Sequence, residues 1–258
     1  MEFYISSATD VGNKRAVNQD SYFAGRFVIR GEPAAFAVLC DGLGGLEHGE
    51  IASKSISSAF SDWVREMSGG APEKIFQDHE IRRQWTRLIE EQNARLRRYG
   101  QQNQCVLGST VTAILLNRSR YYILNIGDTR AYEMKEQVRQ LTEDHTVIAE
   151  EVRRGNLSAE QARSAPMRNV LTRCVGIDAQ VYGDFFFGDV LPGAVYMLCS
   201  DGFRHSIAEE EMRMQLIPPS GVTEESLEKA NRFLIECNKQ RGETDNISVV
   251  TIYVKNEK

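Results

Sequence analysis

The chain contains little that would crosslink it, place it in a membrane or leave it unfolded. Its five cysteines are odd in number and irregularly spaced, which argues against a disulfide framework and against a zinc site. No apolar stretch approaches the ~20 residues that cross a bilayer, and residues 1–5 lack the basic and apolar pattern of a leader. There are only six prolines, and no low-complexity tract or internal repeat marks a linker. These absences predict a single cytoplasmic domain over residues 1–258, with no membrane partner.

The composition is that of an ordinary globular protein. Hydrophobic residues make up 41% of the 258 residues and charged residues 26%, which is sufficient for a buried core. The formal net charge is −5, and the arginine pairs alternate with acids on expected helices, so no nucleic-acid partner is predicted. Cys40, Cys174 and Cys199 lie in apolar runs and are expected to be small buried side chains.

Two hydrophobic patterns occur in blocks along the chain. Short β-branched or aromatic runs predict strands, and long segments with apolar residues three or four positions apart predict helices. Trp63 and Trp85 lie on the apolar faces of two such helices and are expected in the core. Blocks of strands with hairpin-length turns, separated by long helices, favour antiparallel sheets flanked by helices over a parallel alternating sheet. The expected strands are 3–8, 21–30, 34–40, 110–116, 121–126, 131–135, 138–141, 181–187, 194–199 and 247–254, and the expected helical segments are 50–67, 80–99, 145–166 and 224–239.

Aspartates stand at the turns that open or close several of these strands. A carboxylate at the end of a buried strand is costly to desolvate unless a cation or donor meets it, and several together repel one another. With only four histidines in the chain, hard oxygen ligands favour Mg²⁺ or Mn²⁺ over Zn²⁺. The pattern is typical of a metal-dependent phosphoryl-transfer site, although a tight turn explains each Asp-Gly pair equally well when it is taken alone. The aspartates are Asp20, Asp41, Asp128, Asp201 and Asp245.

Arg15 lies five residues before Asp20. Its guanidinium is always charged and offers a planar pair of donors that matches two phosphate oxygens. Because an arginine near the N-terminus is usually a solvated surface residue, the hypothesis that Arg15 holds a phosphoryl group depends on the neighbouring Asp20.

The ordered set of motifs resembles the PP2C family of metal-dependent phosphatases, in its compact bacterial serine/threonine type. Each motif is short, but their common order covers nearly the whole chain. The resemblance implies an α+β fold: a PP2C-like four-layer αββα sandwich, with two antiparallel sheets between helix pairs and a small helical flap over about residues 144–180. The segments that carry it are 12–20, 41–45, 49–53, 108–110, 127–130, 141–145, 168–173 with Gly176, 200–202 and 245–249.

The same resemblance implies which residues bind metal. Asp41 would bridge two Mn²⁺ or Mg²⁺ ions, with the carbonyl of Gly42 as a further ligand to one of them. Asp201 and Asp245 would hold the other ion. Asp128, together with Asp201, resembles the pair that holds a third, weaker ion in bacterial members.

Two further roles and two departures complete the comparison with the family. Asp20 would orient metal-bound waters, and Arg15 would bind the substrate phosphate. Gln19 stands where the family usually has glutamate, and Leu43 where some eukaryotic members have a histidine as a candidate general acid. Other candidate proton donors are the histidines at positions 48 and 145, although a structural role explains each of them as well.

The resemblance implies an enzyme that hydrolyses phosphoserine and phosphothreonine in proteins by a metal-activated water, without a phosphoenzyme intermediate. It would act in bacterial signalling as a cytoplasmic monomer on proteins phosphorylated by a serine/threonine kinase. Two alternatives remain open, a pseudophosphatase that only binds and a phosphatase of small phosphorylated metabolites. The presence of Asp41, Asp201 and Asp245 favours catalysis over the first, and the charged flap favours a protein substrate over the second.

Overall fold

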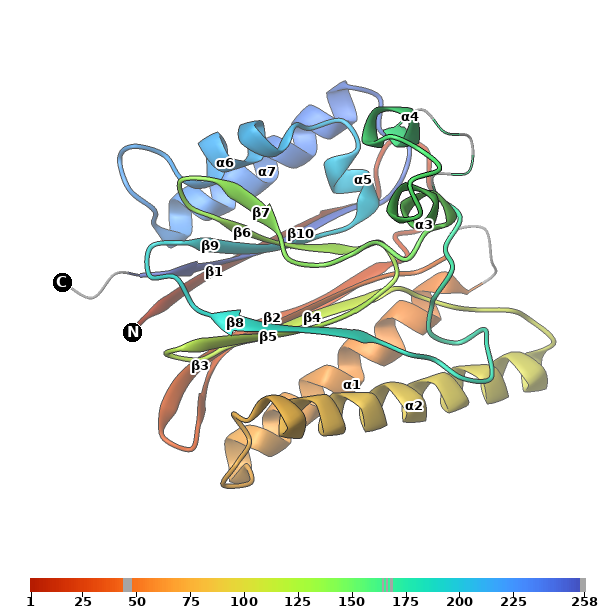
Figure 1. The fold of residues 1–258 in the computed structure, drawn as a ribbon, viewed down its shortest axis with the longest axis horizontal. Coiled ribbons are helices and arrows are strands. Elements are labelled where there is room, and N and C mark those ends of the chain that lie inside the picture. The colour runs from red at the N-terminus through yellow and green to blue at the C-terminus, as the bar shows by residue number, and fades with distance from the viewer. Residues whose placement is uncertain (44–47, 164, 166, 168, 256–258) are drawn as a thin grey trace.

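The computed structural model of the chain describes residues 1–43, 48–163, 165, 167 and 169–255. Figure 1 shows two stacked β-sheets with helices on their outer faces. The strands of one sheet are β1 (Phe3–Asp10), β6 (Arg130–Met134), β7 (Val138–Gln140), β9 (Val195–Cys199) and β10 (Ile247–Val254). Those of the other are β2 (Asp20–Ile29), β3 (Glu32–Asp41), β4 (Val111–Leu116), β5 (Arg120–Ile126) and β8 (Asp184–Asp189). The helices are α1 (Gly49–Gly70), α2 (Asp78–Asn103), α3 (Val147–Arg153), α4 (Ala159–Arg163), α5 (Asp201–Arg204), α6 (Glu209–Leu216) and α7 (Glu224–Gln240).

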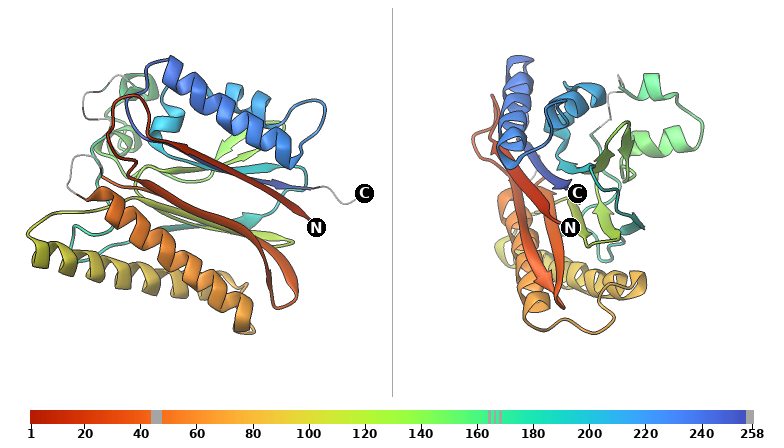
Figure 2. Two further views of the ribbon diagram at one scale, coloured as in Figure 1. Left: turned by 180° about the vertical axis from the view of Figure 1, so that it is seen from behind. Right: turned by 90° about the vertical axis from the view of Figure 1, so that its left-hand side faces the viewer.

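The strand orders are β1-β10-β9-β6-β7 and β2-β3-β4-β5-β8, and neighbouring strands in both sheets are antiparallel. Helices α6 and α7 cover the outer face of the first sheet, and α1 and α2 cover that of the second, as Figure 2 shows from two further sides. The α+β sandwich predicted from the sequence is therefore confirmed. No helix within the described ranges is both long and apolar enough to cross a bilayer.

Strand β3 separates two of the three hydrophobic cores. Phe36 and Val38 point toward α1 and α2, whereas Ala37 and Leu39 point toward the facing sheet. Side chains alternate between the two faces of a strand, so Asp41 at the end of β3 continues the series that faces the other sheet. The strand's hydrophobic alternation thus delivers a carboxylate to the end of the space between the sheets.

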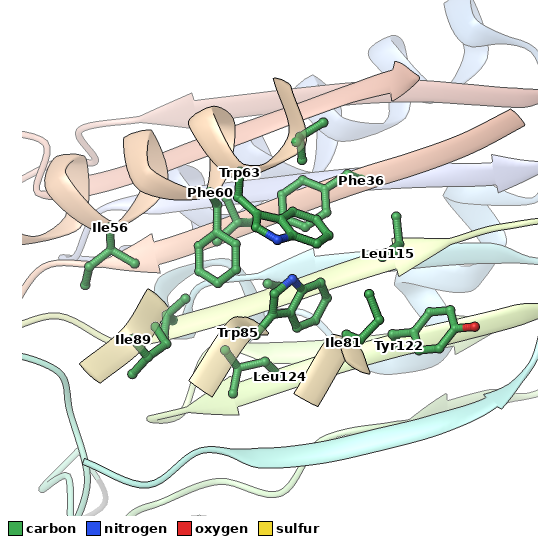
Figure 3. Close-up of a cluster of buried hydrophobic side chains, with 14 of the residues drawn as sticks. Phe36, Ile56, Phe60, Trp63, Ile81, Trp85, Ile89, Leu115, Tyr122 and Leu124 are labelled. Atoms are coloured by element: carbon green, nitrogen blue, oxygen red, sulfur yellow. The ribbon is translucent and has the colours of Figure 1, made fainter. Parts of the chain in front are cut away.

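The core beneath α1 and α2 is built around four aromatic rings (Figure 3). Trp85 is fully buried, and its ring packs edge-to-face against Trp63, Phe36 and Phe60 at centroid distances of 5.6, 6.0 and 5.8 Å. Such edge-to-face contacts add to the stabilisation from burial. Both tryptophans lie in the core as predicted, and so do the three cysteines expected there.

Two expectations about secondary structure were wrong, and two helices were not predicted. The segment 145–166 contains two short helices, α3 and α4, because Gly155 adopts a left-handed φ of 77° and the hydroxyl of Ser158 caps α4 by accepting from the amide of Gln161. Ser164 and Pro166 of that segment lie outside the described residues. The strand expected over 181–187 begins only at Asp184. Helices α5 and α6 were not predicted, since segments of four and eight residues carry too little periodicity.

Candidate active site

The site begins with Asp20 and Asp41, which are direct cross-strand neighbours at the ends of β2 and β3. On its other side, the backbone of Asp41 bonds to Thr110. The amide of Asp41 donates to Oγ1 of Thr110 at 2.9 Å, and the carbonyl oxygen of Asp41 accepts from the amide of Thr110 at 2.9 Å. Asp20 and Asp41 therefore form a non-hydrogen-bonded pair, in which side chains approach closely. Burial raises the pKa of Asp20 to about 7, and repulsion from Asp201 and Asp245 adds to the rise. Both carboxylate oxygens of Asp20 are buried without a hydrogen-bond partner.

Three further carboxylates converge on this pair from other elements. Burial first, and then repulsion from Asp20, Asp201, Asp128 and Asp245, raises the pKa of Asp41 well above its usual range. These aspartates come from β2, β3, the β5–β6 turn, the start of α5 and the residues before β10. The five aspartates singled out in the sequence thus lie close enough to act on one another electrostatically.

Arg15 reaches the same cluster and makes a two-point ion pair with Asp245. Its Nε lies 3.0 Å from Oδ1 and its Nη2 lies 2.8 Å from Oδ2. The hydrogen bond to Asp245 raises the pKa of the guanidinium, with Asp41 and Asp201 adding to the effect. The structure therefore places Arg15 beside the carboxylates, but its planar fork is engaged by one of them.

Two residues that the sequence reasoning missed connect α5 to the loop before β10. Oε1 of Glu243 accepts from the amides of Thr244 (2.7 Å) and Asp245 (3.0 Å), and Oε2 lies 3.4 Å from Nδ1 of His205. On its other side, Nε2 of His205 lies 3.6 Å from Oδ2 of Asp201. Burial alone would raise the pKa of Glu243, but His205 and the two amides lower it to about 2. The sequence offered one signal for these two residues: Glu243 stands two residues before Asp245, and His205 stands four residues after Asp201.

The glycines of the two Asp-Gly pairs are required by close packing. Neither Gly42 nor Gly202 is among the residues with positive φ. A Cβ on Gly42 would lie 2.4 Å from the carbonyl oxygen of Gly49, and one on Gly202 would lie 2.2 Å from that of Asn246. Because Gly42 and Gly202 have no Cβ atom, α1 can approach β3 and α5 can approach the loop before β10. A glycine that only formed a tight turn would not need this close contact.

Replacing Gly202 with alanine should destabilise the protein by roughly 1–3 kcal/mol, because the added methyl group must push α5 away from Asn246. Urea unfolding of the metal-free protein measures this free energy. A matched control is Gly69→Ala in α1, where a Cβ meets nothing within 4 Å and helix propensity predicts a gain of about 0.5–1 kcal/mol. Equal stabilities for the two variants would contradict the packing role of Gly202.

The donor set fits hard divalent cations. Both oxygens of Asp20 and Oδ1 of Asp201 are buried acceptors with no hydrogen-bond partner, so cations would satisfy groups that are otherwise costly to bury. Within the described part of the chain, no three carboxylate, imidazole or thiol side chains already form a metal-binding group. One of the proposed ligands, Asp245, is engaged by Arg15 in this structure.

Of the two histidines considered as proton donors, His145 is engaged in the fold. It is buried, its Nδ1 accepts from the amide of Gly127 at 3.1 Å, and its Nε2 lies 2.9 Å from Oδ2 of Asp184. Burial lowers the pKa of His145, so the neutral ring holds the turn before Asp128 against β8. His48 remains near the surface beside Glu50. Of the quoted motif residues, those at 44, 45 and 168 lie outside the described part of the chain.

Comparisons with known proteins agree with this arrangement. Residues 12–235 match the sequence profile of the family described as protein phosphatase 2C. The chain is 30% identical to the serine/threonine phosphatase stp of Listeria innocua, over 95% of this chain and 93% of that protein. Its fold resembles serine/threonine phosphatase Stp1 from Staphylococcus aureus, with a TM-score of 0.84 and 25% identity over 99% of this chain and 96% of that one. It also resembles the catalytic domain of the serine threonine protein phosphatase PstP in complex with two manganese ions, with a TM-score of 0.79 and 24% identity over 98% and 99% of the two chains.

Proposed function

The chain belongs to the protein phosphatase 2C family, and from this premise we propose that its aspartate cluster is the centre at which phosphoserine and phosphothreonine of proteins are hydrolysed. The observation that carries the proposal is the cross-strand pair of Asp20 and Asp41, in which both carboxylate oxygens of Asp20 are buried without a hydrogen-bond partner. Their burial and mutual repulsion are costly unless cations neutralise them. The enzyme is a serine/threonine protein phosphatase of a metal-dependent family, so such cations belong to its chemistry.

We propose that Asp41, the carbonyl of Gly42, Asp201 and Asp245 hold two Mn²⁺ or Mg²⁺ ions. Bound divalent ions lower the pKa of water and neutralise charge on phosphoryl oxygens. The two manganese ions named for the PstP catalytic domain support this number and this metal. The Oδ1 atom of Asp201, buried without a partner, is the kind of acceptor that such an ion would satisfy.

Asp20 and Arg15 would act on water and on substrate. Asp20 has two buried oxygens without donors and would accept hydrogen bonds from water beside the phosphate. Arg15 offers its fork to the phosphate and stabilises charge on two phosphoryl oxygens. Because this fork now holds Asp245, substrate binding requires Asp245 to exchange Arg15 for another positive partner.

We further propose that residues 144–180 form a flap at the mouth of this site within a single domain over residues 1–258. Hydrogen bonds close its base, from Val147 N to Val170 O (2.9 Å) and from Thr172 N to His145 O (2.8 Å). Helices α3 and α4 lie at the same end of the sandwich as α5, opposite the two termini (Figure 1).

The substrate would be a protein that a serine/threonine kinase has phosphorylated. The phosphatase would act on it as a monomer in the cytoplasm. A hollow of about 1300 Å³ along α1 and α2 ends at Asn18 and Asp20 and offers space for residues that flank the phosphate. The five cysteines of the chain are free, which suits a reducing compartment.

Steady-state hydrolysis tests this proposal. The purified chain should release phosphate from p-nitrophenyl phosphate and from phosphothreonine peptides only with Mn²⁺ or Mg²⁺ present, and EDTA should stop both reactions. The kcat/KM should be higher for the peptides than for sugar phosphates. No metal-dependent turnover would favour a binding module, and a preference for sugar phosphates would favour a metabolite phosphatase.

A further inference from the structure

Arg204 is a buried arginine at the edge of the proposed metal centre. It lies on α5, three residues after Asp201, and its side chain is 13% exposed. Its Nη2 donates to the backbone carbonyl oxygen of Asp128 at 3.1 Å and lies 3.4 Å from Oδ2 of the same residue. The same nitrogen lies 3.6 Å from Oδ2 of Asp144. Arg204 is thus fixed between two carboxylates.

Arg204 acts on both Asp144 and Asp128, and its hydrogen bonds go to Asp128. Asp144 is already held at both oxygens by Arg130, with Nε–Oδ1 and Nη2–Oδ2 distances of 2.8 Å each. A buried guanidinium is costly unless carboxylates meet it, and the same holds for a buried carboxylate. The Nη2 group of Arg204 therefore offsets the charge of Asp128, while its Nε is buried without a hydrogen-bond partner.

This arrangement does not fit the third ion that the family resemblance associates with Asp128 and Asp201. A divalent ion at the carboxylate of Asp128 would stand next to a guanidinium nitrogen that is 3.4 Å from Oδ2. Like charges at such distances repel strongly where water is scarce. An ion at Oδ2 of Asp128 would require Arg204 to move, and the hydrogen bond from Arg204 to the Asp128 carbonyl opposes that movement.

We propose that the guanidinium of Arg204 takes the place of a third metal ion at Asp128, so that this phosphatase works with two bound ions. The inference rests on the proposed two-ion centre and adds to it a cation that belongs to the chain, the guanidinium of Arg204. Unlike an exchangeable ion, this cation is present at every metal concentration. Its contribution to the field at Asp128 and Asp201 therefore does not depend on metal supply.

Counting bound Mn²⁺ tests the inference without reference to turnover. The electron paramagnetic resonance signal of free Mn²⁺ reports how many ions each chain removes from solution. The wild-type chain and Asp128→Asn should both bind two ions. A wild-type chain that binds three ions, one of which is lost in Asp128→Asn, would overturn the inference.

Substitutions at position 204 give the converse test. Arg204→Met removes the charge but keeps an unbranched apolar side chain, so Asp128 should become available and a third ion should bind. That ion should be lost again in the double variant Arg204→Met/Asp128→Asn, whereas Arg204→Lys, which keeps the charge, should still bind two. A folded Arg204→Met chain that binds two ions would contradict the inference.

Circular dichroism checks that each variant at position 204 is folded. If none of them folds, the count for Asp128→Asn decides alone, because that variant leaves Arg204 in place. A wild-type chain that binds no Mn²⁺ would overturn the metal centre itself, and the role of Arg204 with it. A third ion that depends on Asp128 would overturn only the role of Arg204.

Discussion

Asp41→Asn should abolish most turnover and yet make the metal-free protein more stable. Loss of even an outer partner of a metal ligand costs about 10- to 100-fold in affinity or activity, so loss of the proposed metal ligand Asp41 should cost more than about 100-fold in kcat/KM. The pKa of Asp41 in the folded chain is well above its usual range. The native state therefore binds more protons than the unfolded state, and stability falls as the pH rises above ~4, the ordinary pKa of aspartate. Asparagine removes this penalty.

Thermal unfolding in EDTA at pH 5 and pH 8 measures the second effect. The melting temperature of Asp41→Asn should exceed that of the wild type, and the difference should be larger at pH 8. Added Mn²⁺ should then raise the melting temperature of the wild type but not of the variant. Asp189→Asn, at a side chain 86% exposed, is the matched control and should change neither activity nor melting. Near-normal turnover by Asp41→Asn would remove Asp41 from the metal centre.

Trp85→Ala should produce the largest loss of stability in the chain, roughly 3–5 kcal/mol in the free energy of unfolding. Trp85 is fully buried and touches the rings of Phe36, Phe60 and Trp63, so its removal leaves a cavity that these neighbours cannot fill. Urea unfolding of the metal-free protein is the appropriate measurement.

Two companion substitutions sharpen that result. Trp85→Phe should cost less than alanine, since the buried Nε1 of Trp85 has no hydrogen-bond partner to lose. Phe233→Ala on α7, at a residue 50% exposed, should change stability by no more than about 0.5 kcal/mol. A small effect at Trp85 would mean that the core beneath α1 and α2 collapses to fill the space.

Hydrophobic periodicity predicted the elements that form the layers. The strand expected over 247–254 has the same bounds as β10. The helix expected over 224–239 corresponds to α7, which ends one residue later. These segments are long, and each has one face that must be buried, so their pattern repeats often enough to be read. Segments whose conformation depends on a few capping or turn contacts, such as α4 and α5, have no comparable pattern.

Site residues were predictable where their spacing within a short segment had a chemical reason. Asp41 ends an apolar strand, Asp201 follows one closely, and each precedes a glycine; the structure brings both to one cluster. Glu243, His205 and Arg204 were missed because their roles arise from partners on other elements. No pattern near Arg204 indicates that its side chain meets Asp128 from the β5–β6 turn.

The ion pair between Arg15 and Asp245 couples two binding events at the proposed centre. While the guanidinium covers Asp245, the proposed metal ligand and the proposed phosphate-binding group neutralise each other. An ion that takes Asp245 releases Arg15 for phosphate, and a phosphate that draws Arg15 away exposes Asp245 to an ion. By thermodynamic reciprocity, each ligand then strengthens the binding of the other by the same factor.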